Sequence, residues 1–366
     1  MNGLLRRGHQ VRLLGPATIA GSACEDGAEF IFYSSVPVRD PSLPASEGVS
    51  IRVVTDSPGV EEDLGAEISR RRPDVLLSDF FLQSAIRLGR AEGLPTIGLG
   101  QTLFRSIAES SLPTALEHAD RVLMFSHRRF DSHPARDERY VYVGLGRPFD
   151  YPRGVAMWRS RQPRVLVSLS TSFQTQLPLL ERICEALSSL PVEAIVTTGH
   201  GIAPEVLSVR SNVCVKRFAS HDALLPAADL LITHGGHGTV LAGATHGIPA
   251  LILPMGRDQP TVAAAAVRLG LATIADPNAS VPALRTAINA ALANAAMRSR
   301  VVQFAASIPN DECLETAVDL IEMIDTQRLD PKPARLYSRS KGSSPERVES
   351  GSRGERDADR LAEAGP

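Results

Sequence analysis

One stretch, Asp229-Leu-Leu-Ile-Thr-His-Gly-Gly-His-Gly-Thr-Val-Leu-Ala-Gly-Ala244, constrains the fold more than any other part of the sequence. Residues 230–233 form a short apolar run, which is typical of a buried parallel strand. Gly235, Gly236 and Gly238 interrupt that run, and an apolar, Ala-rich segment follows that predicts a helix. Glycine accepts positive φ and lets the backbone approach a ligand closely, so this turn is suited to binding.

The helix after this turn begins where a phosphate group could bind. Thr239 can cap this helix. The free backbone N–H groups of a first helical turn and the helix dipole both attract anions. A strand, a glycine turn and a helix N-terminus in this order therefore predict a site for a phosphate or a diphosphate.

Composition limits the class of protein. The 366 residues, 43% of them apolar, are enough for two α/β domains. The net charge of −2 gives no electrostatic reason to expect nucleic acid as a partner. No apolar run approaches the roughly 18 residues of a membrane span, so we expect no stable membrane insertion. The four cysteines show no CxxC spacing, which favours a cytoplasmic protein over a disulfide framework.

Strands and helices alternate along most of the chain, which predicts two α/β domains with parallel sheets. The first domain spans 1–148, a Gly-, Pro- and Arg-rich linker spans 149–163, and the second domain spans 164–327. The last residues, 328–366, are rich in Arg, Ser, Gly and Glu, and we expect them to be disordered. The expected strands are 9–14, 28–32, 49–54, 73–78, 95–99, 122–125, 140–143, 164–169, 192–197, 213–216, 229–233 and 249–253.

The chain starts inside a segment that resembles the end of a helix, residues 1–7, with Gly8 as its C′ glycine. A doubly wound domain should have a strand before this helix, and that strand would be central in the sheet. We therefore expect its neighbours to lose a ladder of hydrogen bonds. Either the true start lies upstream of Met1 or the first domain is rearranged, and the intact later strands favour the first explanation.

His234 and His237 form an H-x-x-H pair, which could indicate a metal site. In the predicted loop they flank glycines, and no third ligand lies at metal-ligand spacing. A hydrogen-bonding or cationic partner for phosphate is therefore the preferred interpretation.

Other polar residues follow predicted strands, where doubly wound sheets bind their ligands. Asp258 and Gln259 offer a carboxylate and an amide that suit sugar hydroxyls, although Asp258 could equally be an ordinary N-cap. Ser168-Leu-Ser-Thr-Ser172 could meet the same ligand or be a plain βα loop. Phe218 could stack on a base or belong to the core.

Together these segments resemble the donor motif of the UDP-glycosyltransferase superfamily, which has the GT-B fold of two Rossmann-like domains that face each other across a cleft. The resemblance is strongest to the bacterial antibiotic, or macrolide, type. It runs from Phe218 through His234-Gly-Gly-His-Gly-Thr239 to Pro254-Met-Gly-Arg-Asp-Gln259. It extends over roughly residues 1–326 and is weaker before 164.

The resemblance implies a role for each matching residue. Phe218 would stack on the nucleotide base, with His221 beside it, and Asp258 with Gln259 would hold the sugar hydroxyls. The implied co-substrate is a nucleotide diphosphate sugar, with no cofactor, and the implied partner is a small hydroxylated acceptor. The diphosphate would be bound by residues of two βα loops: Ser170, Thr171, His234, Gly235, Gly236, His237, Gly238 and Thr239.

The sequence departs from the family at the catalytic base. In the family, a histidine of the first βα loop takes the proton from the acceptor hydroxyl, and this chain starts after that loop. Asp79 matches the aspartate that orients the histidine. His9 lies in a later segment and is expected to be structural.

The leading hypothesis is an inverting, metal-independent glycosyltransferase that moves a sugar from a UDP- or TDP-sugar to a hydroxyl of a small natural-product or lipid-like acceptor. One alternative is a nucleotide-sugar-binding pseudoenzyme or auxiliary protein, because the base is absent. The other is a GT-B nucleotide-sugar epimerase, which the context of Gly238-Thr239 and Asp258-Gln259 disfavours.

Overall fold

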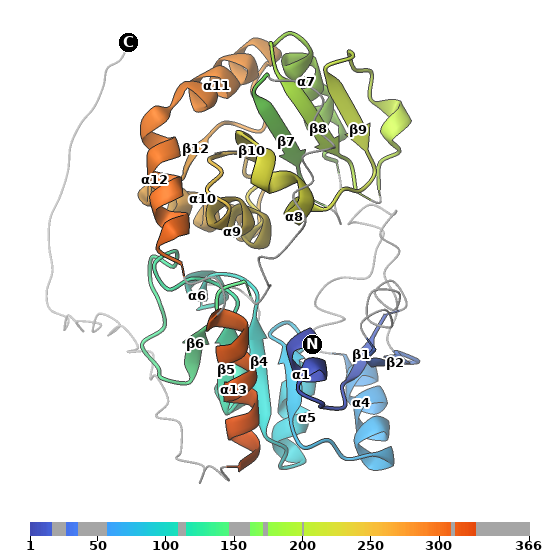
Figure 1. Cartoon of the computed structure of the whole chain (residues 1–366). Coiled ribbons are helices and arrows are strands. Elements are labelled where there is room, and N and C mark those ends of the chain that lie inside the picture. The colour runs from blue at the N-terminus through green and yellow to red at the C-terminus, as the bar shows by residue number, and fades with distance from the viewer. Residues whose placement is uncertain are drawn as a thin grey trace, which may run out of the picture. The chain divides into compact units, whose positions relative to one another are not determined.

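The computed structural model describes residues 1–16, 27–35, 57–108, 115–145, 162–170, 175–199, 201–308 and 312–326. The linker 149–163 (apart from its last two residues), the expected strand 49–54 and the tail 328–366 lie outside the described residues. Figure 1 labels most of the helices and strands described below.

The second domain is built on a parallel sheet with the order β12-β11-β10-β7-β8-β9. This is a doubly wound order, in which the chain runs outward from β7 in one direction and then from β10 in the other. The strands are β7 (Arg164–Ser168), β8 (Glu193–Thr197), β9 (Val213–Lys216), β10 (Leu230–Thr233), β11 (Ala250–Ile252) and β12 (Ala272–Ile274).

Helices cover both faces of this sheet because successive strand residues point to opposite faces. Val165 and Val167 pack with α7 and α11, whereas Leu166, which lies between them, packs with α9, α10 and α12. All three strand residues are fully buried. The helices are α7 (Leu177–Ser188), α9 (His237–Thr245), α10 (Gln259–Arg268), α11 (Val281–Ala293) and α12 (Ala295–Ala306), and shorter turns lie at η4 (Pro204–Val206), α8 (His221–Leu224) and η5 (Leu225–Ala227).

The first domain contains two separate parallel sheets within the described residues, β1-β2 and β3-β4-β5-β6. Leu14 of β1 and Leu76 of β3 pack in one hydrophobic cluster with α4 and α5, so one core serves both sheets. Among the described residues, no strand pairs with both β1 and β3, so the two sheets are not joined by a ladder there. The elements are α1 (Asn2–Arg6), β1 (Arg12–Gly15), β2 (Glu29–Phe32), α4 (Pro58–Arg70), β3 (Leu76–Asp79), α5 (Gln83–Ala91), β4 (Thr96–Gly100), α6 (Phe104–Ala108), η2 (Ala115–His118), β5 (Arg121–Met124) and β6 (Tyr140–Tyr142).

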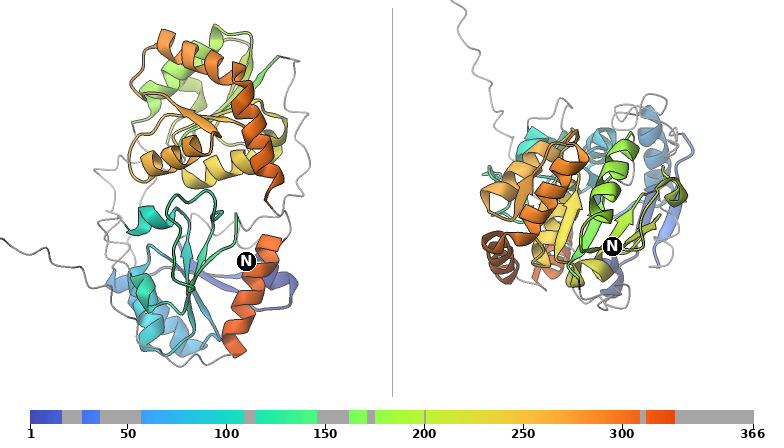
Figure 2. Two further views of the ribbon diagram at one scale, coloured as in Figure 1. Left: turned by 90° about the vertical axis from the view of Figure 1, so that its left-hand side faces the viewer. Right: turned by 90° about the horizontal axis from the view of Figure 1, so that it is seen from above.

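The last described helix, α13 (Glu312–Thr326), packs on the sheet of the first domain (Figures 1 and 2). Its Ala317 and Ile324 are buried against Ile97 and Leu123. Arg7, at the end of α1, also forms ion pairs with three carboxylates of this helix. Those pairs are solvent-exposed and contribute little, so the apolar contacts hold the helix in place. Sequence order alone did not predict this return to the first domain.

Candidate functional site

The candidate site lies where the strand order of the second sheet reverses, between β7 and β10. The carboxyl ends of these strands are paired, with Ser168 opposite Thr233. The loops that follow them, which contain Ser170 and His234, therefore leave the sheet side by side. Ligands of doubly wound sheets bind at this kind of position. The Nε2 atom of His221 lies 2.8 Å from the Ser168 hydroxyl, which ties a third loop to the same edge.

The turn before α9 requires glycine for steric reasons. Gly235 has a φ of 96°, and a Cβ atom there would lie 2.9 Å from the side chain of Ile252. A Cβ on Gly236 would lie 2.8 Å from the His234 ring. Gly238 is different because a Cβ there would meet nothing within 4 Å. The small size of Gly238 therefore leaves open surface at the start of α9.

The N-terminus of α9 has no side-chain cap. The helix begins at His237 with Gly236 as its N-cap, so Thr239 is inside the first turn. The expectation that Thr239 caps the helix was wrong, because the helix begins three residues earlier than the sequence pattern indicated. Backbone N–H groups of the first turn consequently remain without a side-chain acceptor, and such groups bind anions.

His234 stands directly before this turn and is largely buried. Burial lowers the pKa of its imidazole to about 4, so the ring is neutral at pH 7. Its Nδ1 atom is buried and lacks a hydrogen-bond partner within the part of the chain that is described. A buried polar atom without a partner is costly in a folded protein, which favours a ligand at this point. The geometry favours a hydrogen-bonding rather than a cationic role.

His237 contacts the first domain. Its ring is 4% exposed, and its Nε2 atom lies 3.0 Å from the hydroxyl of Ser126, the second residue after β5. The ring also meets the edge of Phe130. Burial lowers its pKa to about 4. The contact with Ser126 occupies one ring nitrogen, and a role for His237 in donor binding stays a prediction.

Asp258 and Gln259 follow β11 and start α10, but they use their side chains differently. Asp258 occupies the N-cap position without a side-chain cap bond, so its carboxylate is not used by its own helix. Instead it accepts a hydrogen bond from the hydroxyl of Thr102 at 2.6 Å. Gln259 is 8% exposed, and its Oε1 accepts the Met255 backbone N–H at 2.7 Å. Gln259 can therefore offer its amide N–H groups to a ligand.

The structure says less about the other residues that were predicted to bind the donor. Phe218 is 62% exposed, which excludes the interpretation that it is a core residue. Ser170 lies at the start of the loop after β7, and its backbone N–H donates to Gln176 at 3.0 Å. Thr171 lies outside the described residues.

Asp79, the predicted orienting residue, ends β3 in the first domain. Its Oδ1 accepts the Phe81 backbone N–H at 2.9 Å, and its Oδ2 accepts the side-chain amide of Gln101 at 2.8 Å. Burial raises the pKa of this carboxyl group. The Gln101 side chain therefore holds the Asp79 carboxylate in the described structure. Asp79 lies at the carboxyl end of a strand, as the sequence predicted.

Sequence reasoning missed Gln101, Thr102 and Ser126. Each follows a strand of the first domain, β4 or β5, at its carboxyl end. That position was the available signal, because the carboxyl ends of parallel strands share one edge. Their partners could not be found from the sequence, since Thr102 and Asp258 are 156 positions apart.

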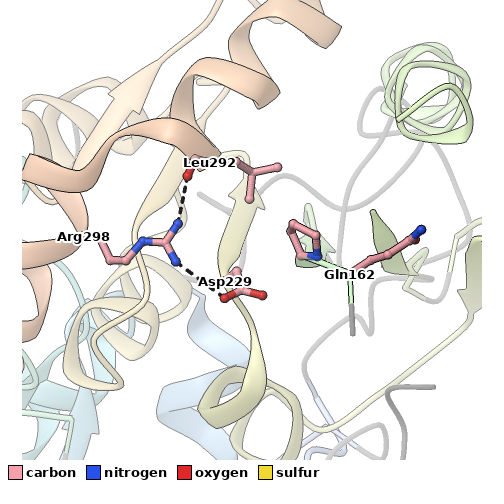
Figure 3. Close-up of a pocket in the computed structure, with 5 residues that line it drawn as sticks. Gln162, Asp229, Leu292 and Arg298 are labelled. Atoms are coloured by element: carbon pink, nitrogen blue, oxygen red, sulfur yellow. Dashed lines mark hydrogen bonds and ion pairs between the residues drawn. The ribbon is translucent and has the colours of Figure 1, made fainter. Parts of the chain in front are cut away.

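A pocket of about 200 Å³ lies at the opposite edge of the second sheet (Figure 3). Asp229 precedes β10, so it marks the amino end of the strand whose carboxyl end leads to His234. The Arg298 guanidinium contacts the Asp229 carboxylate at 3.6 Å and donates to the Leu292 carbonyl at 2.8 Å. These contacts link α12 to the sheet, and the pocket is separate from the candidate site.

Two classes of feature are absent from the described residues. Groups of three or more His, Cys, Asp or Glu side chains that could hold a metal ion do not occur there. A search of the same residues found no helix long and apolar enough to cross a membrane.

Comparison with known proteins defines the class. Residues 181–323 match the family model of the erythromycin biosynthesis protein CIII-like C-terminal domain. The NDP-glycosyltransferase YjiC of Bacillus licheniformis is 25% identical over 361 residues, covering 87% of this chain and 91% of that protein.

Solved structures of glycosyltransferases are also similar to this chain. The glycotransferase of kitacinnamycin superposes with a TM-score of 0.70 at 25% identity, covering 88% of this chain and 93% of that one. The glycosyltransferase VinC, solved with DTDP, gives a TM-score of 0.66 at 17% identity, covering 89% and 94%. The fold is that of the GT-B glycosyltransferases, and the relatives identify the chain as a glycosyltransferase. The family match and these relatives support the UDP-glycosyltransferase superfamily that the donor motif predicted.

Proposed function

We propose that this glycosyltransferase moves a sugar from a UDP- or TDP-sugar to a hydroxyl group of a small natural-product or lipid-like acceptor. The reaction proceeds with inversion at the anomeric carbon and without a metal ion. The observation that carries the proposal is the uncapped N-terminus of α9 at the point where the strand order reverses, beside the unpartnered Nδ1 of His234. The names of the relatives support it, because one is an NDP-glycosyltransferase and VinC was solved with DTDP.

The diphosphate is the part of the donor that this geometry suits best. Backbone N–H groups at the start of α9 and the helix dipole stabilise negative charge. The Nδ1 atom of His234 is the ring atom that is left for the diphosphate, and it donates to a phosphate oxygen in the tautomer that carries the proton on Nδ1. Because the imidazole is buried, this bond acts in a low-dielectric environment and is stronger than it would be in water. Gly238 gives the phosphate oxygens access to the first turn.

The transfer step needs charge stabilisation and a base. The acceptor oxygen forms a bond to the anomeric carbon while the bond from that carbon to the diphosphate oxygen breaks. Negative charge then grows on the leaving diphosphate, and the groups that face it lower the barrier. The acceptor proton must pass to a general base; the given sequence holds no histidine at the family's position for it, and Asp79 is the residue that would orient such a base in our assignment. Asp258 and Gln259 hold the sugar hydroxyls, and Phe218 stacks on the nucleotide base.

A transfer assay tests the proposal. The full chain is incubated with UDP-glucose or TDP-glucose and a set of small hydroxylated aglycones in the presence of EDTA. We expect a glycoside of inverted anomeric configuration, detected by mass spectrometry and NMR. His234→Ala should lower turnover by about 100-fold or more, which is typical for loss of one charge-stabilising donor.

The control is Arg298→Ala, which alters the pocket at the opposite edge of the sheet and should leave turnover unchanged. Equal turnover by His234→Ala and the original chain would contradict the donor site. Loss of turnover in EDTA that Mg²⁺ restores would contradict metal independence. Consumption of the nucleotide sugar to an isomeric nucleotide sugar without an acceptor would indicate an epimerase instead.

A further inference from the structure

The side chain of Asp258 has an unusual partner. Its carboxylate accepts a hydrogen bond from the hydroxyl of Thr102, a residue of the first domain, at 2.6 Å. This distance is typical of a strong, charge-assisted O–H···O⁻ bond. The partner is an aliphatic alcohol, which is the same chemical group that a sugar presents.

The structure keeps Asp258 available for such a group. The residue is at the N-cap position of α10, where an aspartate commonly bonds its own helix, yet it makes no cap bond. Arg257, immediately before it, has a φ of 58°, which is strained for a residue other than glycine. The backbone at this turn thus adopts a costly conformation just before a carboxylate that points away from its helix.

Thr102 is held in place from both sides. The neighbouring Leu103 is fully buried in a cluster of the second domain. The next backbone N–H, that of Phe104, donates to Asp131 at 2.7 Å. On the other side, the Gln101 side chain bonds Asp79. With its neighbours fixed, Thr102 can leave Asp258 by rotation of its side chain, without a shift of the backbone.

From these contacts we propose that the Thr102 hydroxyl occupies the sugar subsite at Asp258 and is displaced when a donor sugar binds. The inference rests on the proposed function. The Thr102 contact forms an internal competitor for a sugar hydroxyl, so it weakens binding of the complete nucleotide sugar. It does not affect a nucleoside diphosphate, which has no sugar to place at Asp258. Thr102 thereby tunes the preference of the site for nucleotide sugar over free nucleotide.

Thr102→Val tests this competition because it keeps the shape of the side chain and removes the hydroxyl. Calorimetric titration of the full chain with UDP, TDP, UDP-glucose and TDP-glucose measures each affinity. We expect Thr102→Val to bind the matching nucleotide sugar about tenfold more tightly, from loss of one hydrogen bond to a charged group, with the nucleoside diphosphate unchanged. Thr102→Ser keeps the hydroxyl and should behave like the original chain.

Two further measurements keep the outcomes distinct. Thermal unfolding of each variant checks that the fold is retained. In an Asp258→Ala background, Thr102→Val should give no gain, since the partner of the hydroxyl is gone. Unchanged or weaker binding of the nucleotide sugar by Thr102→Val, with normal binding of the diphosphate, would overturn the competition. Failure of the original chain to bind any of the four ligands would instead overturn the proposed function, and the competition with it.

Discussion

Two glycines of the donor motif have different tasks. Gly235 lies at positive φ, and a Cβ atom at this position would clash with Ile252, so the fold itself requires glycine there. Gly238 lies in the first turn of α9 and is exposed, with no protein atom near a substituted Cβ. We propose that glycine is required at position 238 because a side chain there would block the bound diphosphate.

A matched pair of substitutions separates these tasks. Gly235→Ala should lower the free energy of unfolding by at least about 1 kcal/mol, because alanine is strained at positive φ. Gly238→Ala should keep or raise that free energy, since alanine favours a helix by up to about 1 kcal/mol over glycine. It should nevertheless weaken binding of UDP or TDP. Urea unfolding and calorimetry measure both effects, and normal nucleotide binding by Gly238→Ala would refute the role of this surface.

At the residue scale, the sequence predicted the side chains that lie in one continuous motif. His234, Asp258 and Gln259 could be recognised because strand, turn and helix follow each other along the chain. The hydrogen-bond partners of the motif's residues in the first domain could not be recognised from the sequence. Ser126 is 111 positions from His237, and nothing local in either segment indicates the contact. The lowered pKa of His234 could not be predicted from the sequence either, because it results from burial by residues that are far away in sequence.

Among secondary-structure elements, β3 has one edge without a partner strand in the described part of the chain, and this has a measurable consequence. The N–H groups of Leu76 and Phe80 donate to the carbonyls of Pro95 and Leu99, on the side of β4. Because alternate residues of a strand point to opposite edges, the N–H of Leu77 points to the other edge. Among the described residues, no strand pairs with β3 at that edge.

Hydrogen exchange of the folded chain tests this edge. The amide of Leu77 should exchange at least about tenfold faster than that of Gly98, because β4 is paired on both sides and exchange requires an open hydrogen bond. Peptide-level mass spectrometry with NMR assignment of these two residues gives the comparison. Equal protection of both amides would show that another strand covers the edge of β3.

Elements were more predictable than their packing. The described strands other than β12 lie within three residues of their expected limits, because short apolar runs alternate with helical segments. The strand β12 (Ala272–Ile274) was not expected from the sequence. Phe104–Ala108 and Ala115–His118 are shorter than typical helices and had no clear pattern. The position of α13 depends on its fit to Ile97 and Leu123, which sequence order does not encode.

At the scale of the whole molecule, the loops of the first domain meet the donor motif of the second. Thr102 contacts Asp258 and Ser126 contacts His237. Phe130, which is fully buried, joins the hydrophobic cluster that contains α9 and α10. Residues from both domains therefore surround the proposed donor site, although the motif itself belongs to the second domain.

We propose that the turn from β10 to α9 binds the diphosphate of a nucleotide sugar. Calorimetric titration of the full chain with UDP and TDP, in EDTA, tests this binding. We expect saturable binding of at least one nucleotide by the original chain and its loss in His234→Ala, while Arg298→Ala binds normally. Nucleotide binding of the same strength by His234→Ala, or no binding by the original chain, would contradict it.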